Sequence, residues 1–157
     1  MSPHEPSPPP LRFAFQARVT VAKPIDTGPA MDIRRRMIPI TGGTVAGPRL
    51  EGRVLPGGAD WQVIAPDGTA DLVASYIIEA ADGTLITVVN RGLRRAAPEV
   101  LARLAAGETV DPSLIYFRAS PRFEAPPGPH FWLARSVFLC QASRRAGALE
   151  LDFFEVL

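Results

Sequence analysis

The sequence predicts an all-β protein, an antiparallel eight- to nine-stranded barrel with one short helix. Segments in which apolar residues recur with a period of two run through most of the 157-residue chain, and Gly-rich turns separate them. Only one segment has the helical pattern, and neither a β-α-β alternation nor an internal repeat is present. An up-and-down barrel of this strand number closes every sheet edge and can hold one small ligand in its interior.

The chain length indicates one domain preceded by a tail. Residues 1–10, MSPHEPSPPP, are half proline and predict a disordered or polyproline-like segment. Residues 11–157 are predicted to form the barrel domain. A domain of this size buries about 70% of its unfolded surface, so it needs neither a disulfide nor a metal for stability.

The first third of the domain contains two predicted strands. Phe13, Phe15 and alternate residues that follow face one way, which predicts a half-buried strand from Leu11. Residues 23–31 hold two prolines and one glycine and predict a turn region. Residues 32–40 predict the second strand, which Gly42-Gly43 interrupts or ends. The run 34–36 is three arginines, so either its central member points inward or the strand is bulged there.

Shorter strands are predicted at residues 49–55 and 61–65, and longer ones at 70–80 and 84–90. Pro66-Asp67-Gly68 is a turn signal, and Asp82-Gly83 predicts a tight hairpin. On the 70–80 strand one face carries Leu72, Ala74, Tyr76 and Ile78.

The single helix is predicted from Pro98 to Gly107, because proline is favoured in a first helical turn and glycine just after the last. It is short and is expected to cover a barrel end or lie across the outside. Strands resume at residues 114–123, 131–142 and 148–156, with a turn near Ala146-Gly147.

The segment Gly47–Trp61, GPRLEGRVLPGGADW, has the glycines and prolines of an exposed loop yet ends in an acid next to an indole. A loop of this kind is expected to be a lid, a plug or the wall of a pocket. Between barrel strands, it is predicted to bring Asp60 and Trp61 to the barrel mouth or lumen.

Composition argues against several classes of function. The formal net charge of +1, from 17 basic and 16 acidic residues, predicts no binding of nucleic acid or anionic membrane. There is no apolar run long enough for a membrane helix and no signal-peptide pattern. The lone Cys140 cannot form an intramolecular disulfide, is expected to be a buried thiol, and suits the cytoplasm.

Catalytic motifs with known spacing are absent from the sequence. No Cys/His cluster has metal-ligand spacing, and no phosphate-binding glycine loop or GxSxG turn is present. His130, in PPGPHFW, is interpreted as a turn residue at the start of a strand. We therefore expect neither a metal nor a cofactor.

Three residues are the candidates for catalysis. Asp60 is either a desolvated acid with a raised pKa or a turn residue that binds nearby backbone amides. Tyr76 is expected to point inward, where its phenol can donate to a ligand oxygen. Arg118 lies between aromatic residues and is either an inward anion or carbonyl clamp or a surface arginine.

Four further residues are the candidates for ligand binding. Trp61 is interpreted as core or pocket wall. Trp132 alternates with small residues, which leaves space for a cavity. Arg49 and Phe123 complete this set.

Several of these motifs together resemble the DUF3237 family, also called UPF0311. They are GGTVAGPRLEGRVLPGGADW, the later DG hairpin, YFRASPRFE and FWL, and they span about Leu11 to Val156. The resemblance implies a small calycin-like β-barrel and makes Asp60, Trp61, Tyr76, Arg118 and Trp132 the lumen candidates. Where the family pattern commonly reads WLN, this chain has Ala134, so a ligand contact made by that asparagine would be missing.

The function predicted on these grounds is a small-molecule-binding barrel that acts as a cofactor-independent isomerase, cyclase or lyase. Asp60 would be the acid/base, while Tyr76 and Arg118 would polarise an oxygen of a small oxygenated metabolite. The alternatives are a non-catalytic carrier barrel and an interaction protein with a filled interior. A homodimer contact through Phe153-Phe154 is a further option.

Overall fold

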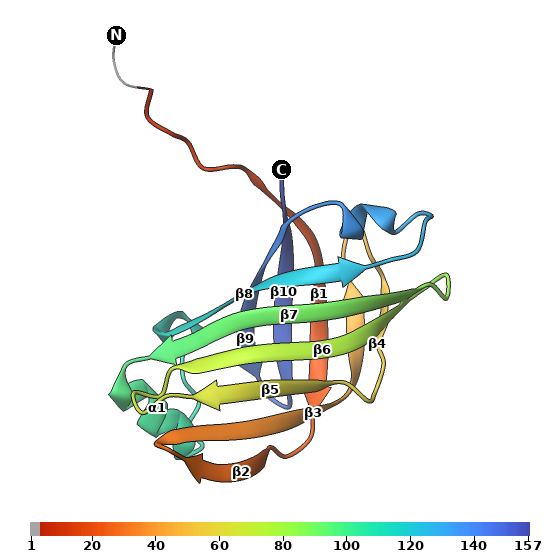
Figure 1. Cartoon of the computed structure of the whole chain (residues 1–157). Coiled ribbons are helices and arrows are strands. Elements are labelled where there is room, and N and C mark those ends of the chain that lie inside the picture. The colour runs from red at the N-terminus through yellow and green to blue at the C-terminus, as the bar shows by residue number, and fades with distance from the viewer. Residues whose placement is uncertain (1–3) are drawn as a thin grey trace.

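The computed structural model describes residues 4–157 and confirms the predicted fold class: an 8-stranded closed antiparallel barrel with two outer strands and a single short helix (Figure 1). The elements in chain order are β1 (Leu11–Val21), β2 (Ile25–Ala30), β3 (Ile33–Ala46), β4 (Gly52–Val54), β5 (Ala59–Ile64), β6 (Ala70–Ala80), β7 (Leu85–Ala96), α1 (Pro98–Ala105), η1 (Pro112–Leu114), β8 (Ile115–Glu124), η2 (Phe131–Ala134), β9 (Phe138–Arg145) and β10 (Ala148–Val156).

The barrel wall follows the order β1-β10-β9-β8-β7-β6, and every pairing is antiparallel. β4 and β5 both lie between β6 and β3, one after the other along the wall. β3 then pairs with β1 and closes the barrel. Closure leaves few free strand edges, which protects an all-β chain from edge-to-edge association.

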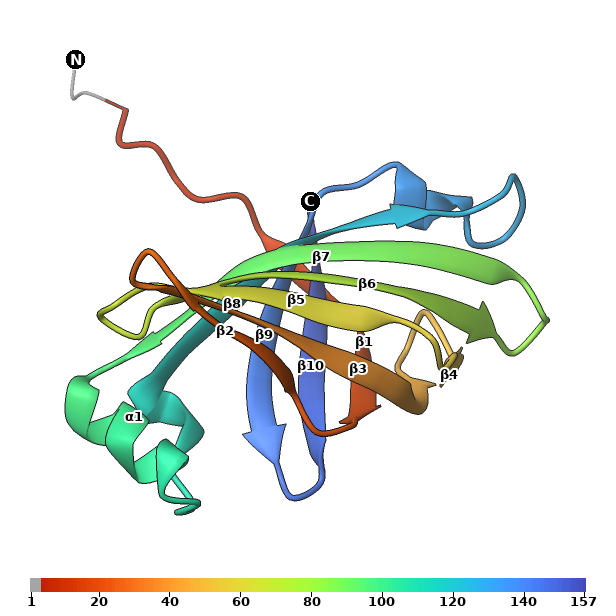
Figure 2. The same ribbon diagram turned by 60° about the horizontal axis from the view of Figure 1, so that its bottom comes forward.

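One end of the barrel is open because β3 changes partners along its length. Residues 40–46 of β3 pair with β1, whereas residues 33–37 pair with the outer strand β2. In Figure 2 the β9–β10 hairpin and the β2–β3 pair separate at this end, and α1 lies at the same end of the barrel. We call this end the mouth.

The opposite end is filled by aromatic rings. Phe15 stacks on Phe153 with 4.6 Å between ring centroids, and Phe123 packs edge-on against Phe138 at 5.0 Å. Leu133 of η2 is buried against the same cluster. Burying each large side chain contributes about 1.5–3 kcal/mol, so this end holds much of the stabilising core.

Of the Phe153-Phe154 pair predicted as a dimer contact, one ring belongs to this cluster, and the homodimer itself stays a prediction. Phe153 is fully buried, so it cannot present its ring to a second chain. The neighbouring Phe154 packs at 5.8 Å against Phe13 from β1.

Two segments have a secondary structure that differs from the one predicted. Residues 23–31 include β2, although its proline and glycine predicted a turn region. Residues 131–142 were predicted as one strand, but the chain first forms the single turn η2, which buries Leu133, and β9 begins only at Phe138.

Gly42-Gly43 does not interrupt β3. The strand runs through both glycines, and a Cβ at Gly43 would overlap the carbonyl of Arg18 on β1. Glycine is therefore required here by the close approach of two strands, not by a chain break.

Residues 4–10 are exposed and form no helix or strand, and the remainder of the predicted tail, residues 1–3, lies outside the described residues. Within residues 4–157, no helix is long and apolar enough to cross a membrane.

Candidate functional site

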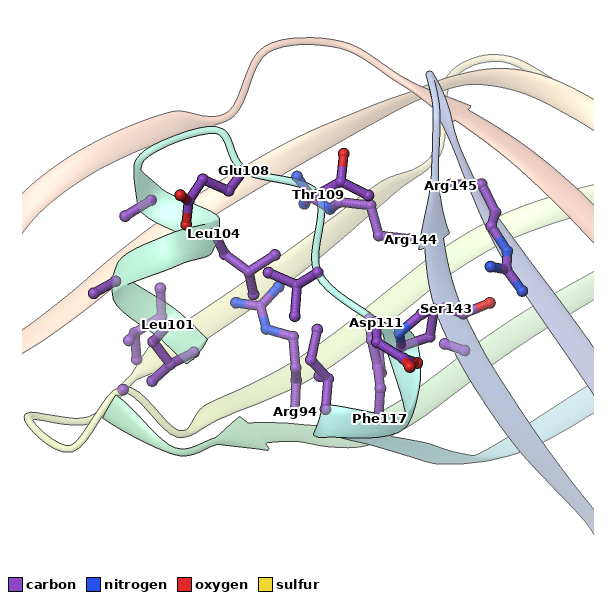
Figure 3. Close-up of a pocket in the computed structure, with 18 of the residues that line it drawn as sticks. Arg94, Leu101, Leu104, Glu108, Thr109, Asp111, Phe117, Ser143, Arg144 and Arg145 are labelled. Carbon is purple, nitrogen blue, oxygen red and sulfur yellow. The ribbon is translucent and has the colours of Figure 1, made fainter. Parts of the chain in front are cut away.

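A chamber of about 790 Å³ occupies the mouth of the barrel beneath α1 (Figure 3). Side chains from β3, β5, β7, β8 and β9 and from the α1–η1 segment line it. Its apolar surface comes from Ile64, Leu101, Leu104, Val110, Ile115 and Phe117. A volume of this size falls in the range of small-molecule sites.

A narrower cavity of about 50 Å³ continues from the chamber into the barrel. Phe117 and Ala142 line both spaces, which places the smaller one directly behind the larger. Most of its walls are aliphatic, but three polar residues enter it, namely Asp60, Tyr76 and Asn90.

Strand register brings these three side chains together. Asp60 on β5 pairs with Ala74 on β6, and Ala74 pairs with Asn90 on β7. Asp60 and Asn90 therefore lie in one row of the inner face, two strand spacings or about 10 Å apart. The small Ala74 between them leaves space, and Tyr76 lies on the same face one inward position further along β6.

Asp60 is connected to the mouth by a short relay of hydrogen bonds. Arg36 Nε donates to Gln62 Oε1 at 2.6 Å, and Gln62 Nε2 donates to Asp60 Oδ2 at 2.8 Å. The other carboxylate oxygen, Oδ1, is buried without a partner in residues 4–157. Asp60 can therefore accept a proton or a hydrogen bond from a ligand in the inner cavity.

The pKa of the Asp60 carboxyl is raised above its ordinary value. Burial is the largest cause, since it disfavours the charged form, and the Gln62 hydrogen bond and the charges of Arg94 and Arg36 oppose it only in part. A raised carboxyl pKa is what proton transfer near neutral pH requires.

Tyr76 and Asn90 also carry unpartnered polar atoms. Within the described residues, the Tyr76 hydroxyl and Asn90 Oδ1 are both buried without a hydrogen bond. Burial also raises the pKa of Tyr76, so the phenol stays protonated and can donate. Each buried polar group without a hydrogen bond lowers the free energy of unfolding by about 1–3 kcal/mol. Three such groups on one cavity are unusual in a folded protein.

Arginines form the rim of the chamber. Four point inward: Arg34, Arg36, Arg94 and Arg144. Figure 3 shows Arg94 rising from β7 between α1 and β8, and Arg144 reaching from β9 toward Thr109. Burial, together with the charges of Arg36 and Arg144, lowers the pKa of Arg94 to about 10.

The run 34–36 takes neither of the arrangements expected from the sequence. Arg36 and Arg34 face the chamber, while Arg35 lies exposed on the outer side in regular pairing with Val63. Strand parity thus points two of the three arginines inward without a bulge.

Trp61 and Arg118 lie outside the barrel, so their predicted place in the lumen was wrong. Trp61 is 58% exposed, because it follows the inward Asp60 and adjacent strand residues point to opposite faces. Arg118 is exposed, lies over the Tyr116 ring and donates to the carbonyl of Phe117. The alternative interpretation, a surface arginine, is confirmed.

The other three ligand-binding candidates lie at the filled end of the barrel and line neither cavity. The Arg49 guanidinium stacks 3.7 Å from the centroid of the Trp132 ring and pairs with Glu155. Phe123 belongs to the ring cluster. Glu155 also accepts hydrogen bonds from Arg12 and Ser136. This network is satisfied internally, as expected of a structural contact.

Asn90 and Arg94 were not among the predicted site residues, because Asn90 was interpreted as the last residue of its strand and Arg94 lay beyond it. β7 continues to Ala96, and both residues share the inward parity of Ile86 and Val88. That parity was the available signal, but the polar run Asn90-Arg91-Gly92 is typical of a turn.

Neither a metal site nor a reactive thiol emerges from the described residues. No three His, Cys, Asp or Glu side chains gather within residues 4–157. Cys140 is a buried thiol, as predicted, and burial raises its pKa to about 12.

Comparison with known proteins decides the family. The sequence model of the family described as "Protein of unknown function (DUF3237)" matches residues 9–156 of this chain. The chain belongs to the DUF3237 family. It is 44% identical to a UPF0311 protein of Rhodopseudomonas palustris over 148 residues, or 92% of this chain and 94% of the relative. The solved structure of the conserved protein RPA1785 from R. palustris is 37% identical, with a TM-score of 0.93 over 98% of this chain and 100% of that one.

This chain is also similar, at lower coverage or identity, to proteins described as enzymes. The hydroalkoxylation enzyme phnH of Penicillium herquei is 34% identical over 85 residues, which cover 54% of this chain and 56% of that protein. A solved enzyme from the same fungus shares the fold, with a TM-score of 0.74 at 22% identity over 98% of both chains.

Proposed function

We propose that this DUF3237 barrel is an enzyme that performs proton-transfer chemistry on an oxygenated small molecule in its lumen. The observation that carries the proposal is the convergence of Asp60 Oδ1, Tyr76 OH and Asn90 Oδ1, all buried and unpartnered, on one cavity. Three buried polar atoms on one cavity are costly to leave unpaired, and a polar ligand, or ordered water where no ligand is bound, completes them. Stability given up at a site of this kind is typical of function.

Each residue has a role in this proposal. The Asp60 carboxylate takes a proton from the substrate, and its raised pKa lets it return that proton to another atom. The Tyr76 hydroxyl donates to a substrate oxygen on which negative charge develops. Asn90 orients the substrate by accepting or donating one hydrogen bond.

The reaction class is isomerisation, cyclisation or a lyase reaction, none of which changes the oxidation state of the substrate as a whole. The similarity to the hydroalkoxylation enzyme phnH favours cyclisation. In a hydroalkoxylation, a hydroxyl loses its proton, its oxygen forms a bond to an alkene carbon, and the other alkene carbon gains a proton. One acid/base group near both atoms is sufficient to move that proton.

The proposal is tested by deuterium incorporation from D2O. The protein is incubated with its co-purifying ligand, identified by native mass spectrometry, and with alcohols and phenols that carry an alkene near the hydroxyl. The wild type should place solvent deuterium on carbon. Asp60→Asn should lower that rate about 100-fold or more, and Tyr76→Phe about tenfold.

Asp71→Asn is the matched control, because Asp71 is an exposed carboxyl on the outer face of β6. Equal deuterium incorporation by wild type and Asp60→Asn would refute the acid/base role. A ligand that co-purifies, binds and never exchanges would instead establish the carrier alternative, for which the apolar chamber is equally suited.

A further inference from the structure

We infer that the arginines at the mouth bind an oxyanion, so that the substrate is an organic anion with an apolar body and a carboxylate or phosphate group. The inference rests on the proposed function only in taking the chamber as a substrate site.

Two of the lining arginines are already neutralised. Arg34 forms an ion pair with Asp26, and Arg145 forms one with Glu150. Figure 3 shows the Arg145 side chain directed away from the centre of the chamber. Neither residue therefore needs a ligand to balance its charge.

Three other arginines lack such a partner. Arg36 donates to the neutral Gln62, and within residues 4–157 the side chains of Arg94 and Arg144 form no hydrogen bond and no ion pair. The Arg94 guanidinium lies 5.9 Å from the centroid of the Phe117 ring, which carries no charge. Arg36 and Arg94 are half-buried, whereas Arg144 is exposed at the rim. Partly desolvating neighbouring cations is costly unless an anion joins them.

Within residues 4–157, no carboxylate of the chamber forms an ion pair with these three arginines. Glu108 pairs with Arg103, which lies on α1, and Asp111 accepts from the backbone of Ser113. Asp60 lies deeper, in the inner cavity, where its bonded oxygen accepts from Gln62 and not from an arginine. The rim therefore holds a surplus of positive charge.

The chemistry of the walls defines the rest of the ligand. Guanidinium groups bind planar carboxylates and phosphates through paired hydrogen bonds. Leu101, Leu104 and Phe117 offer contact to a ring or hydrocarbon chain next to that head group. A polar metabolite without an apolar body would leave these surfaces unfilled.

The position of Arg94 along the barrel axis determines the direction in which a bound ligand points. Arg94 and Asn90 share one face of β7 and are four residues apart, which is about 13 Å along a strand. An anion held at the rim therefore leaves the reacting part of the molecule directed toward Asp60.

The test uses three naphthalene probes of matched shape: 2-naphthoate, 2-naphthyl phosphate and the neutral 2-naphthamide. Their dissociation constants are measured by calorimetry for the wild type, Arg94→Met and Arg95→Met. Arg95 is the matched control, since it adjoins Arg94 but stacks over Tyr116 on the outer face.

The wild type should bind at least one anion about tenfold or more tightly than the amide. Arg94→Met should lose that preference, while Arg95→Met keeps it. A preference for the carboxylate alone or the phosphate alone would support the inference and identify the head group.

The inference is overturned if the amide binds as tightly as both anions, if no probe binds at millimolar concentration, or if Arg94→Met keeps the preference. Thermal unfolding verifies that Arg94→Met is folded. Asp60→Asn is measured in parallel: anion binding that survives without deuterium exchange separates the rim from the catalytic proposal.

Discussion

Asp60 lies where opposing influences act on one carboxyl. Burial disfavours its charge, while the Gln62 hydrogen bond and two arginines favour it, and burial prevails. A residue evolved only for stability would be neutral here, or would have both oxygens bonded. Asp60 has one oxygen bonded and one free, which leaves it able to exchange a proton with a ligand.

This balance predicts how stability depends on pH. The folded-state pKa of Asp60 lies above its unfolded value of about 3.9. Protonated Asp60 thus contributes stability that is fully present below that value and is lost as the pH rises through the folded-state pKa. Asp60→Asn imitates the protonated form, so it should be about 1 kcal/mol more stable than wild type at pH 7, or ~2–4 °C in Tm.

The measurement is thermal unfolding from pH 3 to 8, with Asp71→Asn as the exposed control. The advantage of Asp60→Asn should disappear toward the acid end. A variant that unfolds below the wild type at pH 7 would show that the Asp60 carboxylate is structural.

At the scale of the element, the strands predicted with correct bounds are those in which apolar and polar residues alternate along the whole length. β6 and β10 were predicted with their observed bounds, because apolar residues alternate regularly and clear turns flank them. β7 was cut short because its mouth end carries polar residues on both faces. The functional lumen is thus where hydrophobic alternation is weakest, since a ligand takes the place of the core there.

The Glu155 network joins elements that no sequence pattern connected. Its carboxylate binds Arg12 from β1, Arg49 from the segment before β4, and Ser136 next to η2. Burial raises the pKa of Glu155, but these hydrogen bonds and charges outweigh it and hold that pKa below its ordinary value.

Glu155→Gln should therefore destabilise the protein by about 1–3 kcal/mol at neutral pH, because two arginines lose their counter-charge. The wild type's advantage should be present above the unfolded pKa of about 4.3 and fall as acid protonates Glu155 through its lower folded-state pKa. Urea unfolding, with exposed Glu124→Gln as control, measures both effects.

Binding of the naphthalene anions should be unchanged in folded Glu155→Gln, since the network lies at the filled end. Loss of anion binding without loss of stability would instead place part of the ligand site near Arg49 and Trp132.

At the scale of the whole molecule, the two ends of the barrel differ in how their polar groups are satisfied. The end with η2 is packed with rings and completes its own ion pairs, whereas the mouth holds uncompensated arginines above three unpartnered atoms. Parity along a strand predicts which face a residue occupies, and so it identified Tyr76 as inward. The height of a residue along the barrel axis depends on the register between strands, which the sequence pattern does not reveal. For this reason Arg49 and Trp132 were grouped with Asp60, although they lie at the other end of the barrel.

The most direct test of this account is an experimental structure of the protein with 2-naphthoate. We expect the carboxylate within hydrogen-bonding distance of Arg94, and Arg36 or Arg144, with the ring against Phe117 and pointing toward Asp60. A ligand bound at the Arg49–Trp132 end, or a mouth that stays empty at saturating probe, would contradict the assignment of the functional site to the barrel lumen.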